Sequence, residues 1–180
     1  LKGLDTSPIK SNDKFNILFV GAFEKRKGFF DLLELIKRFK GENVLFTIIG
    51  DGDDKIKRYA KTFCEENKLF ELVTFPGYVK NGKLLFKFYR SSQLFILPSF
   101  SEGMPRVLYE AMYFNVPIVS TNTNGIPLLL KNNRDALLVN PGDIDKIYLK
   151  IKKIMNDIYL KEKLTNNASK KLSTILKESP

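Results

Sequence analysis

The sequence contains no histidine and no tryptophan, and Cys64 is its only cysteine in 180 residues. Without histidine, the chain cannot use imidazole for acid–base chemistry or in a zinc site. A single cysteine excludes a disulfide within the chain and favours a reducing compartment, so we expect a cytoplasmic protein. No apolar run reaches the roughly 18 residues of a membrane span, and the polar first ten residues do not resemble a signal peptide.

An excess of 30 basic over 20 acidic residues gives the chain a formal net charge of +10, which favours anionic partners. Nucleic-acid binding would need basic residues interleaved with aromatic ones along a groove, or a recognised module. The sequence shows neither, and we expect no nucleic-acid partner. In residues 145–164, lysines lie opposite an apolar helical face. This pattern indicates either a solvated helix or peripheral contact with a membrane or another domain.

Short apolar segments alternate with amphipathic ones along the chain, which is typical of a parallel sheet covered by helices. We predict an α/β fold with a Rossmann-like, doubly wound parallel sheet, helices on both faces, and a single domain over residues 1–180. The predicted strands lie in 15–20, 43–50, 72–79, where Pro76-Gly77 ends the strand, 93–99, 116–121 and 135–143, which we interpret as a final strand with a turn. The predicted helices are 29–40, 54–66, 82–92, 105–114, 143–157 and 159–177, with one or two further turns in 126–133. Helical spacing also predicts a buried face made of Ile56, Tyr59, Ala60, Phe63 and Cys64.

The segment SEGMPRVLYEA (101–111) contains two acids, Glu102 and Glu110, near the start of a predicted helix. If both were helical, they would be about 12 Å apart along the axis. Carboxylates that share one reacting centre in glycoside hydrolysis are about 5–10 Å apart. We therefore interpret the two acids as holding opposite ends of one extended ligand, such as a nucleotide sugar. The alternative is a favourable acid at a helix start and a surface acid paired with a lysine.

The start of this helix is also a predicted anion site. Ser99 or Ser101 can cap the helix, and Pro105 suits its first turn. Free backbone N–H groups at a helix start, together with the helix dipole, favour phosphate. The N–H groups expected to be free belong to Met104, Arg106 and Val107.

Two other turns at the carboxyl edge of the predicted sheet carry polar groups. In GAFEKRKG (21–28), basic side chains can reach a phosphate and Gly28 permits close backbone approach, although the turn has neither the Walker A nor the GxGxxG pattern. A solvated basic turn is the alternative. In STNTNGIP (120–127), amides near Gly125 could contact a sugar, or the segment is a plain loop.

Taken in order, these segments resemble a known family. SEGMPRVLYEAM resembles the E-x7-E motif of the retaining glycosyltransferases of family 4, which have the GT-B fold. The family's first strand, phosphate turn and helix are similar to VGAFEKRKGFFDLLE, and later blocks to FTIIGDGDD, VTFPGYV, LFILPSFSEG, VPIVSTNTNGIP and ALLVNPGD. The similarity spans about residues 15–145, and KGLDT near the start resembles the segment that joins the two GT-B domains.

The resemblance implies the C-terminal, donor-binding half of a GT-B fold, with an N-terminal acceptor domain absent from this chain and a final helix that crosses back to it. The implied reaction moves a sugar from a nucleotide diphosphate sugar to an acceptor hydroxyl by front-face attack, in polysaccharide or glycolipid synthesis. It implies no metal and no other cofactor. An alternative is a nucleotide-sugar epimerase of the same fold, and another is a non-catalytic nucleotide-sugar-binding module.

The resemblance also implies residue roles. Glu102 would bind hydroxyls of the donor sugar, and Lys27 would neutralise the departing diphosphate, so these two are the implied catalytic residues. Glu110 would hold the ribose hydroxyls. The other implied donor-binding residues are Gly21, Arg26, Tyr78, Val79, Gly103, Met104, Arg106 and Val107.

Three positions depart from the family pattern. Many relatives carry an arginine where this chain has Ala22, so either Arg26 or Lys25 substitutes for it or diphosphate binding is weaker. Leu128 stands where an acid is frequent, which leaves one contact unassigned. Asn115 replaces a usual glycine, with an expected structural effect only.

Overall fold

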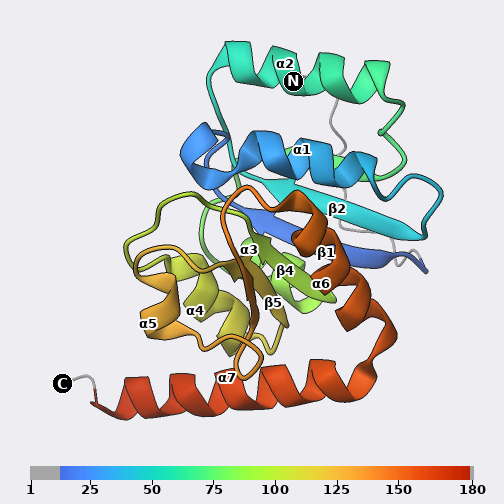
Figure 1. Ribbon diagram of the computed structural model, residues 1–180. Coiled ribbons are helices and arrows are strands. Elements are labelled where there is room, and N and C mark those ends of the chain that lie inside the picture. The colour runs from blue at the N-terminus through green and yellow to red at the C-terminus, as the bar shows by residue number, and fades with distance from the viewer. Residues whose placement is uncertain (1–12, 179–180) are drawn as a thin grey trace.

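A computed structural model describes residues 13–178, so the predicted KGLDT joining segment lies outside the described residues. Within this range, six strands form one sheet in which every neighbouring pair is parallel (Figure 1). The strand order is β3-β2-β1-β4-β5-β6, which confirms the predicted doubly wound fold. The strands are β1 (Phe15–Val20), β2 (Val44–Ile49), β3 (Val73–Gly77), β4 (Leu94–Leu97), β5 (Ile118–Thr121) and β6 (Leu137–Val139).

Helices surround this sheet (Figure 1). They are α1 (Phe29–Lys37), α2 (Asp54–Glu66), α3 (Lys83–Arg90), α4 (Arg106–Tyr113), α5 (Ile126–Leu129), α6 (Ile144–Asn156) and α7 (Ile158–Glu178), together with a 3-10 turn, η1 (Lys25–Lys27). Because parallel crossovers are right-handed, the reversal of strand order after β3 places the crossover helices α1 and α2 on one face and α4 and α5 on the other, whereas α6, which follows the last strand, returns to α1. The helix α1 packs against α2 and α6, and α7 packs against α4. The return of the final helix to another domain stays a prediction.

The core lies between the sheet and these helices, and the predicted face of α2 contributes to it. Ala60, Phe63 and Cys64 are buried as expected, whereas Tyr59 is 47% exposed. Tyr59 instead packs its ring edge-on against Phe30 on the outer side of the helix layer. Burial raises the pKa of the Cys64 thiol to about 11, so this cysteine is a packing residue that stays protonated near neutral pH.

No helix among the described residues is long and apolar enough to span a membrane.

The strands β1 and β4 lie side by side at the centre of the sheet, where the strand order reverses. Ligands of open α/β sheets bind at such a point, in the crevice beyond the carboxyl ends of the strands. The loop that follows β1 carries the basic turn 21–28, and the loop that follows β4 carries Glu102. The fold therefore brings two of the predicted motifs, about 75 residues apart in sequence, to one place.

Candidate functional site

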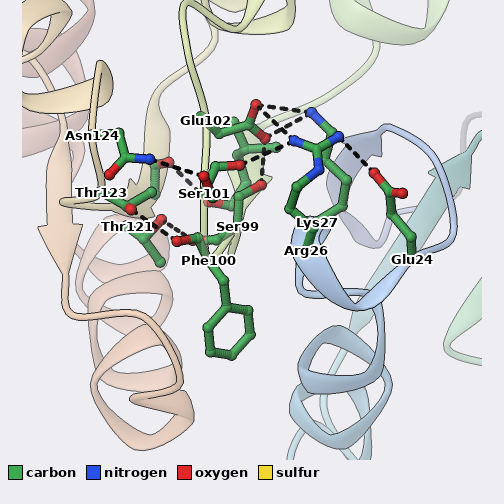
Figure 2. Close-up of polar contacts among 12 residues, drawn as sticks. Glu24, Arg26, Lys27, Ser99, Phe100, Ser101, Glu102, Thr121, Thr123 and Asn124 are labelled. Atoms are coloured by element: carbon green, nitrogen blue, oxygen red, sulfur yellow. Dashed lines mark hydrogen bonds and ion pairs between the residues drawn. The ribbon is translucent and has the colours of Figure 1, made fainter.

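The loop between β4 and α4 is held on one side by the loop that follows β5 (Figure 2). Thr121 at the end of β5 and three residues of the loop after it donate hydrogen bonds to four successive residues of the β4 loop, so that the two segments run alongside each other. The four bonds are Thr121 Oγ1 to Ser99 O (2.5 Å), Thr123 Oγ1 to Phe100 O (2.9 Å), Asn124 Nδ2 to Ser101 Oγ (2.9 Å) and Gly125 N to Glu102 O (3.2 Å). The amide of Gly125 is thus used within the protein, and contact of other amides in residues 120–127 with a sugar stays a prediction.

The basic turn after β1 holds the same loop from the other side. The Phe100 N–H donates to Arg26 O at 2.8 Å, and the Arg26 guanidinium donates to Ser101 O at 3.1 Å. Gly28 has φ of +70°, and a Cβ added there would lie 2.1 Å from the carbonyl oxygen of Pro98. Gly28 is therefore required by the packing of these two loops, and close approach of its backbone to a phosphate stays a prediction.

The carboxylate of Glu102 is surrounded by the side chains of Lys27, Ser99 and Arg26 (Figure 2). Its side chain is only 4% exposed, and Lys27 Nζ lies 2.7 Å from one carboxylate oxygen and 2.9 Å from the other. The hydroxyl of Ser99 donates to the same carboxylate at 2.6 Å, and the Arg26 guanidinium lies 3.9 Å away. Glu102 is thus a buried, paired carboxylate ahead of the helix, which excludes the alternative of an ordinary acid at a helix start.

The start of α4 differs from the prediction in its cap. Pro105 itself is the N-cap residue, and no side chain caps the helix. The two predicted capping residues have other partners: the Ser99 hydroxyl donates to Glu102, and the Ser101 hydroxyl accepts from Asn124. The backbone N–H groups at this end remain available, since within residues 13–178 no protein acceptor is found for those of Gly103, Met104, Arg106 and Val107.

Glu110 is oriented by a tyrosine that the sequence reasoning missed. The hydroxyl of Tyr89 on α3 donates to Glu110 Oε2 at 2.8 Å. Tyr89 is fully buried, and its ring stacks against Phe95 and Phe114. Burial, reinforced by the Glu110 charge, raises the pKa of Tyr89 far above its usual range, so the hydroxyl keeps its proton and acts as a donor. The partner of Glu110 is therefore a buried tyrosine and not the surface lysine of the alternative interpretation.

A pocket of about 440 Å³ opens beside Glu110. It lies between α3, α4 and the last turns of α7, and its walls are mainly aromatic and aliphatic. The lining residues are Asn81, Phe86, Arg106, Tyr109, Glu110, Tyr113, Phe114, Leu172 and Leu176.

Other predicted site residues lie at the same edge without touching this network. Tyr78 is 75% exposed and Val79 is half-buried, both just after β3. Within residues 13–178, no hydrogen bond or ion pair joins either of them to Lys27 or Glu102. The N–H of Gly21 donates to Ile49 O at 2.9 Å, so that amide belongs to the sheet.

The structure also distinguishes the two cations that could compensate for Ala22. Lys25 is exposed. The pKa of Asp31 on α1 is raised by burial, and the positive charge of Lys25 offsets part of this increase. Arg26 instead points to the β4 loop and to Glu102. Arg26 is thus the better-placed substitute.

No group of three or more Cys, Asp or Glu side chains in residues 13–178 could hold a metal ion, and independence from metal stays a prediction.

Sequence comparison decides the family. The family model described as "Glycosyl transferases group 1" matches residues 5–171. The chain belongs to this family. A glycosyltransferase of capsular polysaccharide biosynthesis from Staphylococcus aureus, CapM, is 30% identical to this group 1 chain over 165 residues, which are 89% of the chain and 42% of CapM. A Campylobacter jejuni relative, a GalNAc-alpha-(1->4)-GalNAc-alpha-(1->3)-diNAcBac-PP-undecaprenol alpha-1,4-N-acetyl-D-galactosaminyltransferase, is 33% identical over 86% of the chain and 42% of its own length.

Solved structures of similar fold include a domain of a glycosyl transferase and a protein bound to a sugar nucleotide. Alr3699/HepE of Anabaena, solved in complex with UDP-glucose, superposes with a TM-score of 0.82 at 19% identity over 90% of this group 1 chain and 44% of HepE. The C-terminal domain of LpcC, a glycosyl transferase group 1 protein of Francisella tularensis, gives a TM-score of 0.80 at 20% identity, over 89% of this chain and 85% of that one. These likenesses establish the GT-B type of domain fold. The chain spans about two fifths of the length of the curated relatives it matches.

Proposed function

We propose that this chain is the donor-binding part of a retaining glycosyltransferase that transfers a sugar from a nucleoside diphosphate sugar to an acceptor hydroxyl. The observation that carries the proposal is the contact between Lys27 and the buried Glu102 at the switch point of the sheet, 2.7 Å apart. The contact joins a cation suited to a diphosphate and a carboxylate suited to sugar hydroxyls. Family membership supports the same reaction class.

A donor molecule would lie across the start of α4. The unpaired N–H groups of Met104, Arg106 and Val107, together with the helix dipole, are suited to phosphate oxygens. Glu110 lies further along the helix, with one carboxylate oxygen held by Tyr89 and the other available to ribose hydroxyls. Sugar, diphosphate and ribose would then follow one another from Glu102 to Glu110.

In the proposed step, the acceptor oxygen bonds to the anomeric carbon on the face from which the diphosphate leaves. The bond between that carbon and the phosphate oxygen breaks, and its electron pair stays on the diphosphate. The acceptor proton passes to an oxygen of the leaving phosphate. Negative charge grows on the diphosphate during this step, so Lys27, Arg26 and the N–H groups of α4 would stabilise the transition state electrostatically.

We propose that the complete protein carries an N-terminal acceptor-binding domain and works in polysaccharide or glycolipid synthesis in the cytoplasm, with peripheral membrane contact as an option for a lipid-linked acceptor. Support comes from the relatives, which are longer than this chain and include proteins of capsular polysaccharide and lipopolysaccharide core biosynthesis. We expect the present chain alone to bind nucleotide and to transfer sugar poorly or not at all.

Calorimetry with uridine, guanosine, adenosine and cytidine diphosphates tests the site. At least one should bind, and Lys27→Met should weaken its binding about 10- to 100-fold, the value of one charged hydrogen-bond partner. Lys25→Met removes the same charge from the same turn and should change binding much less, because Lys25 is exposed and, among the described residues, Glu102 pairs with Lys27 and Arg26 instead. Absence of binding to all four, or equal losses in the two variants, would contradict the assignment.

A further inference from the structure

The pairing of Lys27 with Glu102 has a consequence for ligand choice, which rests on the proposed function. We propose that this ion pair makes the site discriminate between a complete sugar nucleotide and the nucleoside diphosphate that remains after transfer. The group that would bind the diphosphate and the group that would bind the sugar are each other's partners when neither ligand is present. Binding of a ligand group to Lys27 therefore changes the free energy of Glu102, and binding to Glu102 changes that of Lys27.

The carboxylate depends strongly on these partners because it is buried. Glu102 is 4% exposed, and both of its oxygens accept from Lys27, whose own side chain is 17% exposed. Among the described residues, the only other cation near it is Arg26, at 3.9 Å. A buried carboxylate that loses its cationic partner is destabilised, because the low-dielectric surroundings no longer compensate its charge.

A nucleoside diphosphate without a sugar would cause that loss. Its phosphate oxygens attract Lys27 and Arg26, which are the two cations that neutralise Glu102. The carboxylate would then keep only the Ser99 hydroxyl, 2.6 Å away, and would lie near a second negative group. Glu102 thus competes with the diphosphate for Lys27 and lowers the affinity for the product.

A sugar nucleotide avoids this cost. Its sugar hydroxyls donate to Glu102 while its diphosphate takes Lys27, so every charged group of the site keeps a partner. Once the sugar has left, Glu102 again competes for Lys27, which favours release of the nucleoside diphosphate. Glu102 therefore has a selective effect that a purely structural residue would not have: its removal should strengthen binding of the product and weaken binding of the donor.

The test measures the affinities of a nucleoside diphosphate, its sugar nucleotide and inorganic pyrophosphate by calorimetry on the wild-type chain and on Glu102→Gln. We expect the variant to bind the nucleoside diphosphate and pyrophosphate at least about fivefold more tightly and the sugar nucleotide more weakly. Asp51→Asn removes one negative charge from the same edge of the sheet, where Asp51 pairs with Lys57, and should leave all three affinities nearly unchanged. Weaker or unchanged binding of the nucleoside diphosphate by Glu102→Gln would overturn the proposal.

A double-mutant cycle locates the effect in the pair. In a Lys27→Met background, replacing Glu102 should no longer tighten binding of the nucleoside diphosphate, and an equal gain in both backgrounds would contradict the proposal. If Glu102→Gln does not fold, as judged by circular dichroism, Glu102→Ala is measured in its place with the same expected signs. Failure of the wild-type chain to bind any nucleoside diphosphate would instead contradict the proposed function on which this inference rests.

Discussion

The two acids of the E-x7-E motif have different surroundings, and this difference suits them to different tasks. Glu102 is buried and neutralised by Lys27, whereas Glu110 is half-buried and receives one hydrogen bond from Tyr89. A carboxylate with one oxygen fixed by a rigid donor presents the other oxygen in a defined direction. Tyr89 suits this role because its stacked ring cannot turn freely and its hydroxyl stays protonated.

At this scale we predict that Tyr89→Phe weakens nucleotide binding about fivefold, because one hydrogen bond that orients Glu110 is worth about 1 kcal/mol. Tyr148→Phe is the matched control, since the Tyr148 hydroxyl also donates to a glutamate, Glu42, at 2.9 Å, but on α6. Calorimetry on the two variants should show the loss in Tyr89→Phe only. Equal affinities of the two would show that Tyr89 does not position Glu110.

The roles of some individual residues could be predicted from the sequence, and those of others could not. The family resemblance implied roles for Lys27, Glu102 and Glu110, and the structure brings the first two into direct contact. It did not indicate Tyr89, because a tyrosine inside an amphipathic helix looks like any core aromatic. Its contact with Glu110 depends on how α3 packs against α4, and helical spacing within either segment carries no information about that packing.

At the scale of elements, the central feature is the β4 loop held between the β1 and β5 loops. Close packing of the three backbones leaves no room for a side chain at certain glycines. A Cβ added at Gly125 would lie 1.7 Å from Gly103 O, and one at Gly28 would lie 2.1 Å from Pro98 O. The loop is therefore positioned by backbone contacts on both sides, and Glu102 is positioned with it.

Alanine substitutions at three glycines distinguish the cost of a positive φ from the cost of steric overlap between the added Cβ and neighbouring atoms. Gly41→Ala should lower the free energy of unfolding by about 1 kcal/mol, because its φ is +81° and nothing lies within 4 Å of an added Cβ. Gly125→Ala, which adds overlap without a positive φ, should cost about 1–3 kcal/mol. Gly28→Ala combines both and should cost the most. Urea unfolding of the three variants checks the order, and a Gly28→Ala no worse than Gly41→Ala would contradict the packing of the loops.

Element boundaries were predictable where hydrophobic pattern decides them and less so where side chains intervene. In the segment 135–143, predicted as a final strand with a turn, the strand covers only Leu137–Val139 and the expected turn follows at residues 141–142. Asp135 is buried and accepts from the backbone N–H of Lys131 at 3.0 Å, so it belongs to the preceding turn. The 3-10 turn Lys25–Lys27 was not expected, because its charged residues show no periodic pattern and its shape follows from contact with the β4 loop.

For the whole molecule, alternation of apolar and amphipathic segments was enough to predict the parallel, doubly wound sheet. That sheet places the carboxyl ends of β1 and β4 next to each other, and with them Lys27 and Glu102. The site is thus a consequence of strand order as much as of local sequence. The net charge of +10 agrees with an anionic ligand but does not locate it, because most lysines are spread over exposed or half-buried positions of the helices.

The most direct test of the account is a crystal structure of the chain with a bound nucleoside diphosphate. We predict diphosphate oxygens within hydrogen-bond distance of Lys27 Nζ and of the N–H groups of Arg106 and Val107, with the ribose hydroxyls on Glu110. A nucleotide bound at another face of the sheet, with Lys27 still on Glu102 and the start of α4 uncontacted, would contradict it.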